Sequence, residues 1–85
     1  MEKVFVVTMT DTTEPESIHV EVYKEVEMAQ KAVKEMFDNE LKALAFADKT
    51  PEYKELCEDG ALIIVEDGIR FSWAITDCEI RSNTN

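Results

Sequence analysis

Few residues in this 85-residue sequence are of the types that catalyse reactions or hold metal ions. It has one histidine, His19, and its two cysteines, Cys57 and Cys78, do not form a Cys-x-x-Cys pair. These are too few for a structural zinc site, and without a secretion signal the cysteines favour reduced thiols, a disulfide being the alternative. Ser17 and Ser72 lack the Gly-x-Ser-x-Gly frame of a nucleophile elbow. We therefore expect no catalytic residue, no metal and no cofactor, and disfavour an enzyme.

Three ligand classes are also disfavoured. Turns account for both glycines, Gly60 and Gly68, which leaves no glycine-rich loop to cradle a phosphate. The acidic run 11–16 lacks the glycine and the spacing of an EF-hand loop, so calcium binding is not predicted. Direct binding of nucleic acid is not predicted either, because 9 basic residues face 19 acidic ones.

The acidic residues are the remaining candidates, since the net charge is −10 and is distributed unevenly. Residues 11–27 hold six acidic residues against Lys24, and residues 52–67 hold six against Lys54, so each stretch carries −5. The other residues balance, with seven acids and seven bases. A charge of this size bears on partners and solubility more than on the fold.

Two strands are predicted at the start of the chain. Residues 4–10 are β-branched and aromatic, and residues 17–23 alternate apolar and polar side chains. We expect one face of this pair to be covered by a helix. That face would carry Phe5, Val7, Met9, Ile18, Val20 and Val22, while His19, Glu21 and Tyr23 would point outward.

A long helix is predicted from about Glu25 to Ala47, because apolar residues recur there at spacings of three and four. Thr50-Pro51 resembles a helix start, with Thr50 as N-cap, and predicts a second, short helix over about 51–58 that ends at Gly60. The helix over 25–47 would cover one face of the sheet.

A hairpin is predicted at the end of the chain, from residues 61–66 and 69–76 joined by Asp67-Gly68 in a type I′ turn. A two-residue loop pairs Ile64 with Phe71 and Leu62 with Trp73. It therefore places Leu62, Ile64, Phe71, Trp73 and Ile75 on the covered face. The expected fold is α+β, two-layered and in the order ββα(α)ββ, with a four-stranded, mainly antiparallel sheet. Residues 1–81 would form one domain, and residues 82–85 a frayed tail.

Two surfaces follow from this layout. Strands that alternate in direction would gather carboxylates at one end, formed by Asp11, Glu14, Glu16, Asp48, Glu52, Glu55, Glu58 and Asp59. The uncovered sheet face would carry Val4, Val6, Tyr23, Ile63, Val65 and Ala74, a candidate contact for a homodimer or another protein partner. The plain alternative for the acidic end is a solvated surface that keeps a small protein soluble.

In size, charge and expected layout the chain resembles the small acidic proteins of phages and mobile elements, among them anti-CRISPR and other DNA-mimic inhibitors. The resemblance is to a functional class, and no motif carries it. It implies a non-catalytic inhibitor whose carboxylates occupy the phosphate-binding groove of a basic, nucleic-acid-binding protein. A small homodimeric scaffold or adaptor is the alternative. No targeting or membrane segment is evident in the sequence, which favours the cytoplasm.

Overall fold

The computed structural model describes residues 2–13, 16 and 18–80. The expected frayed tail at 82–85 and the predicted site residue Glu14 lie outside the described residues. In chain order the elements are β1 (Glu2–Asp11), β2 (His19–Tyr23), α1 (Val26–Phe46), β3 (Pro51–Cys57), β4 (Gly60–Val65), the 3₁₀ turn η1 (Glu66–Gly68) and β5 (Arg70–Ile80).

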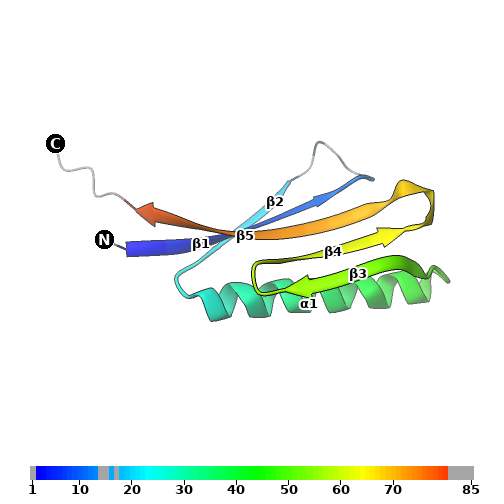
Figure 1. The fold of residues 1–85 in the computed structure, drawn as a ribbon, viewed down its shortest axis with the longest axis horizontal. Coiled ribbons are helices and arrows are strands. Elements are labelled where there is room, and N and C mark those ends of the chain that lie inside the picture. Colours follow the sequence, from blue (N-terminus) through cyan, green and yellow to red (C-terminus); the bar gives the residue numbers. More distant parts are fainter. Residues whose placement is uncertain (1, 14–15, 17, 81–85) are drawn as a thin grey trace.

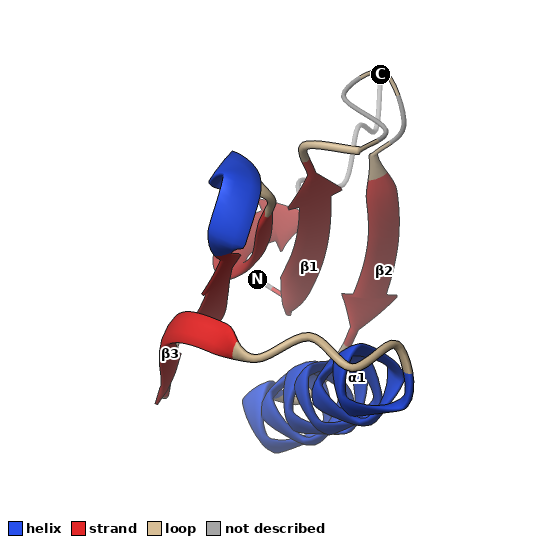
Figure 2. Ribbon diagram, turned by 90° about the vertical axis from the view of Figure 1, so that its right-hand side faces the viewer, coloured by secondary structure: helices blue, strands red, loops and turns tan. Residues whose placement is uncertain are grey.

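The described residues form a five-stranded antiparallel sheet in the order β2-β1-β5-β4-β3, with α1 packed on one face (Figures 1 and 2). The α+β class is confirmed, but the expected four strands are wrong because there are five. The long helix is confirmed within one residue at each end, and its buried residues Ala29, Val33, Phe37 and Leu44 follow the predicted apolar stripe.

The additional strand is β3, which replaces the short helix predicted over 51–58. Its backbone pairs with β4 from Pro51↔Val65 to Cys57↔Gly60, with a register shift between Pro51 and Tyr53. A proline has no N–H for a ladder and is accepted at the start of an edge strand, which β3 is. The helix-start pattern at Thr50-Pro51 is therefore overridden by long-range pairing, which satisfies the backbone of β4 on its second side.

Gly60 is not the left-handed residue that the short helix would have needed. It begins β4, and a Cβ atom built on it would collide with the carbonyl oxygen of Trp73 on the neighbouring strand. Its glycine is explained by this close backbone approach.

The turn between β4 and β5 is one residue longer than predicted. The Val65 N–H donates to the Ile69 carbonyl at 2.8 Å, closing a loop of three residues, and Gly68 has φ 76°. A three-residue hairpin loop ends in such a left-handed residue. Ile63 therefore pairs with Phe71 and Ala61 with Trp73. Because side chains alternate between faces, this shift of one residue exchanges the two faces of β4.

The structure corrects the expected faces of two strands, β4 and β2. Leu62 and Ile64 lie on the open face, whereas Ile63 and Val65 are buried under α1. In β2 the expected faces are also reversed: Tyr23 pairs with Phe5 and Glu21 with Val7 on the helix side. Val20 and Val22 lie on the open face, 53% and 60% exposed, and Ile18 just before them is also exposed.

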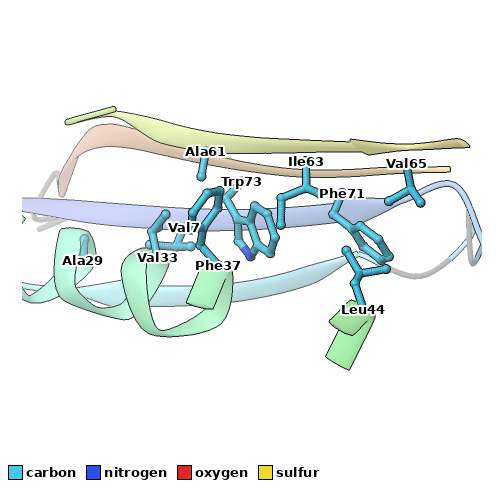
Figure 3. Close-up of a cluster of buried hydrophobic side chains, with 10 residues drawn as sticks. All are labelled: Val7, Ala29, Val33, Phe37, Leu44, Ala61, Ile63, Val65, Phe71 and Trp73. Carbon is cyan, nitrogen blue, oxygen red and sulfur yellow. The ribbon is translucent and has the colours of Figure 1, made fainter. Parts of the chain in front are cut away.

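The core lies between α1 and the middle of the sheet (Figure 3). Phe37 of α1 meets Trp73 of β5 edge to face, with ring centroids 6.1 Å apart and planes at 69°. Around them pack Val7, Ala29, Val33, Leu44, Ala61, Ile63, Val65 and Phe71. The predicted covered positions of β1 and β5, namely Phe5, Val7, Met9, Phe71, Trp73 and Ile75, are confirmed as part of this core or packed against it.

The helix ends in a backbone cap that fixes the next segment. The Lys49 N–H donates to the Leu44 carbonyl at 2.8 Å and the Asp48 N–H to the Ala45 carbonyl at 3.1 Å. Asp48 has φ 60°, so it occupies the left-handed position of a Schellman motif. This cap reverses the chain at the end where β1 also finishes, and β3 then runs back along the sheet.

Candidate functional site

Carboxylates from six parts of the chain lie toward one end of the molecule, where β1, α1 and β4 finish and β3 begins (Figure 1). We call this the first acidic end. Its described side chains are Asp11, Glu16, Glu40, Asp48, Glu52 and Glu66. Asp11, Glu16, Asp48 and Glu52 were placed here from the sequence, whereas Glu40 and Glu66 were not.

The structure removes three residues from the predicted acidic end. Glu58 and Asp59 form the turn between β3 and β4, at the opposite end of the sheet, and Glu55 lies along β3 between the two ends. The reason is that residues 51–57 form an extended strand, which carries the following residues across the molecule, whereas a short helix would have kept them near Asp48. Glu58 and Asp59 instead lie with Asp77 and Glu79, the second acidic end.

Two carboxylates of the first acidic end, Glu40 of α1 and Asp11 of β1, interact electrostatically. Burial raises the pKa of Glu40, and the negative charge of Asp11 at the end of β1 raises it further. Asp11 is itself held in place, since its Oδ1 accepts a hydrogen bond from the Thr13 N–H at 2.6 Å and another from the Thr13 hydroxyl. The fold therefore holds these carboxylates near each other against their repulsion.

A shallow cavity of about 470 Å³ opens at the first acidic end, between the α1–β3 connection and the end of β4. Asp48, Glu52 and Glu66 line it together with one cation, Lys49. Among the described residues no group of histidine, cysteine, aspartate and glutamate is arranged to hold a metal ion. The arrangement offers carboxylate oxygens as acceptors for the donors of another molecule.

The Glu40 interaction gives a pH-dependent prediction. Since Glu40 has a higher pKa in the folded chain than in the unfolded one, its ionisation opposes folding. We expect Glu40→Gln to unfold at a higher temperature than wild type at about pH 7, and to match it below about pH 4, where glutamate is protonated in both states. Thermal unfolding followed by circular dichroism across this range checks it. Equal midpoints at about pH 7 would contradict a raised pKa of Glu40, from burial and from the charge of Asp11.

The histidine belongs to a hydrogen-bonded row along β2. The Glu21 carboxylate lies 2.7 Å from Nε2 of His19 and accepts a hydrogen bond from the Tyr23 hydroxyl. The bond from Tyr23, followed by that from His19, lowers the pKa of Glu21, and the pKa of Tyr23 is raised in return. The alternation in residues 17–23 was the signal for this row, but it was assigned to the wrong face. The row orders an edge strand, and its members among the described residues are a histidine, a glutamate and a tyrosine.

A second row lies along β3, the other edge strand. Glu55 accepts hydrogen bonds from the Tyr53 hydroxyl at 2.7 Å and from the Cys57 thiol at 3.1 Å. The bond to Glu55 raises the pKa of Cys57, which keeps the thiol protonated and is the opposite of what a nucleophile needs. Cys57 and Cys78 are exposed free thiols.

Some of the residues expected on the open sheet face lie there, and others face α1 instead. Val4, Val6 and Ala74 lie on it, since each shares its face with the exposed valines of β2 through the strand register. Tyr23, Ile63 and Val65 do not, because they face α1; Ile63 is fully buried and Val65 is 2% exposed. Their places are taken by Val20, Val22, Tyr53, Leu62 and Ile64.

Within the described residues, no helix is long and apolar enough to cross a membrane. Comparisons of the chain with protein-family models, curated proteins and solved structures found no match.

Proposed function

We propose that this protein is a non-catalytic inhibitor that binds a basic, nucleic-acid-binding protein through its first acidic end. The supporting observation is that separate elements bring carboxylates to the same end of the fold: Asp48, Glu52 and Glu66 line one cavity, and the charge of Asp11 acts on Glu40. Glu16 lies on the connection that leaves β1 at this end. We expect the interaction to take place in the cytoplasm and to need neither a metal nor a cofactor.

The chemistry of such a partner follows from the charges. A groove that binds nucleic acid places Lys and Arg side chains to neutralise phosphates. Carboxylates fixed on a rigid scaffold offer those side chains an alternative set of anions, and an Arg forms strong bidentate hydrogen bonds with a carboxylate. Burial raises the pKa of Glu40, and the charge of Asp11 raises it further. The partner's cations would offset the repulsion between these two carboxylates, which favours binding.

A matched pair of variants tests this function. The first set, Glu16→Gln, Asp48→Asn, Glu52→Gln and Glu66→Gln, removes four charges from the first acidic end. The second set, Glu58→Gln, Asp59→Asn, Asp77→Asn and Glu79→Gln, removes four from the second acidic end. Wild type and both variants are immobilised and exposed to a lysate of the cells that naturally make the protein. Captured proteins are released with duplex DNA or with NaCl.

Wild type and the second set should retain a basic protein that both DNA and salt release, and the first set should lose it. Equal loss in both sets would show that net charge alone is responsible. Absence of any DNA-releasable protein on wild type would overturn the proposal and leave the acidic end as a solubility feature.

A further inference from the structure

The open sheet face differs from the rest of this acidic molecule because it is almost uncharged. Apart from the bulged Glu52, only Glu55 and Arg70 carry charge among the described side chains that the strands direct to this face. The uncharged ones are Val4, Val6, Thr8, Thr10, Val20, Val22, Tyr53, Cys57, Leu62, Ile64, Ser72, Ala74, Thr76, Cys78 and Ile80. One broad face is therefore nearly neutral, although the chain has a net charge of −10.

The apolar residues of this face are neighbours in the sheet. Val22 pairs with Val6, which in turn pairs with Thr76, while Val20 is linked through Thr8 to Ala74. On the other side of β5, Leu62 and Ile64 adjoin Tyr53 of β3. A single helix covers the opposite face, and no described element covers this one (Figure 2). Contiguous exposed apolar surface of this kind marks an interface.

The face is large enough for a stable dimer. Five strands spaced about 4.8 Å apart span roughly 24 Å, and strands of this length give a plane of roughly 600 Å². Side-chain relief adds to the accessible area, which brings it near the ~800 Å² per partner of a standard protein interface.

We propose that a second copy of this chain covers the open sheet face, so that two sheets stack face to face about 10 Å apart around a two-fold axis. The charge distribution favours this occupant. A basic partner is attracted to the two acidic ends. The open face instead suits a flat, uncharged surface rich in β-branched side chains. The same face of another copy has these properties. Both acidic ends then stay at the periphery in water, where their charges need not be desolvated. This inference does not depend on the proposed function.

The dimer has a salt dependence opposite to that of a charge-driven complex. Two protomers of net charge −10 repel each other, and added salt screens that repulsion. Sedimentation equilibrium between about 0.05 and 0.5 M NaCl should show a dimer that strengthens as salt increases. Binding through the acidic end should weaken over the same range, so the two interactions can fail or succeed separately.

Substitutions at the most exposed valines locate the interface. The double variant Val20→Lys and Val22→Lys should be folded by circular dichroism and dissociate about 100-fold more readily, since each buried valine contributes on the order of tenfold. The control is Met28→Lys with Phe46→Lys, which changes the charge equally at helix positions that are 51% and 96% exposed. It should remain dimeric.

A monomeric wild type at about 100 μM, where a stable interface is expected to be populated, would overturn the proposal. So would a dimer unaffected in the valine variant, or one lost equally in the helix control. If the lysines prevent folding, Val20→Thr with Val22→Thr keeps the β-branched shape and should weaken the dimer at least about tenfold. An unchanged dimer in that variant would also contradict the proposal.

Discussion

Replacement of Trp73 by alanine is expected to lower the free energy of unfolding by about 3–5 kcal/mol. Trp73 is 2% exposed and meets the ring of Phe37 edge to face at 6.1 Å, in the middle of the contact between α1 and the sheet. Removing the indole leaves a cavity that both layers border. Since a domain of this size has a total stability on the order of 5 kcal/mol, most of the stability would be lost.

Urea unfolding followed by far-ultraviolet circular dichroism measures this loss, because the variant lacks the sole tryptophan as a fluorescent probe. Tyr53→Ala is the control, since it truncates an aromatic side chain that is 48% exposed on the open face. It should cost less than about 1 kcal/mol. A Trp73→Ala protein as stable as this control would show that β5 does not direct Trp73 into the core.

Two adjacent isoleucines should differ sharply in their contribution to stability. Ile63 has no exposed surface and lies under α1, while Ile64 is half-buried on the open face. Ile63→Ala is expected to cost about 2–5 kcal/mol, because it opens a cavity in the core. Ile64→Ala is expected to cost less than about 1.5 kcal/mol, because it removes only a side chain that water already reaches.

The comparison tests the register of the last hairpin directly, since the two-residue loop predicted from the sequence would reverse the order. Urea midpoints of the two variants, measured well below the concentration at which a dimer would form, are sufficient. A larger loss for Ile64→Ala would mean that β4 is shifted by one residue and that the open face has been assigned to the wrong side chains.

Several parts of the fold could be predicted because a local pattern determines them. The apolar spacing between Val26 and Phe46 allows only one face of a helix to be buried, and that helix is observed. The alternation in β5 placed Phe71 and Trp73 correctly. Large apolar residues occupy one side of this part of the strand and small or polar residues the other, so only one side suits the core.

The faces of β2 could not be predicted from alternation alone. A period of two separates Val20 and Val22 from Glu21 and Tyr23, but it does not say which set faces the helix. Burial of valine argued for the first set. The observed register instead places Tyr23 against the core, and the bonds that Glu21 makes with His19 and Tyr23 satisfy its carboxylate on that side.

Only some residues of the first acidic end could be predicted, because pairing between distant strands again decided where the others lie. Thr50-Pro51 is a good local signal for a helix start, and a local signal carries no information about the free edge of β4. Once Pro51–Cys57 pairs with that edge, Glu58 and Asp59 are carried to the far end of the sheet. Glu66 joins the first acidic end because the hairpin turn lies there, and Glu40 joins because α1 places it opposite Asp11.

The hydrogen-bonded rows on the two outer strands bear on how this chain avoids aggregation. An edge strand is a template for uncontrolled pairing with other chains, and a charge on it discourages that pairing. Glu21 on β2 and Glu55 on β3 each have a lowered pKa, because neighbouring side chains donate hydrogen bonds to the carboxylate. As the solution approaches the isoelectric pH of about 4.4, overall repulsion between molecules vanishes. The hydrogen bonds keep these two glutamates ionised to a lower pH than a glutamate without such bonds, so each outer strand keeps a negative charge that opposes edge-to-edge pairing as this pH is approached.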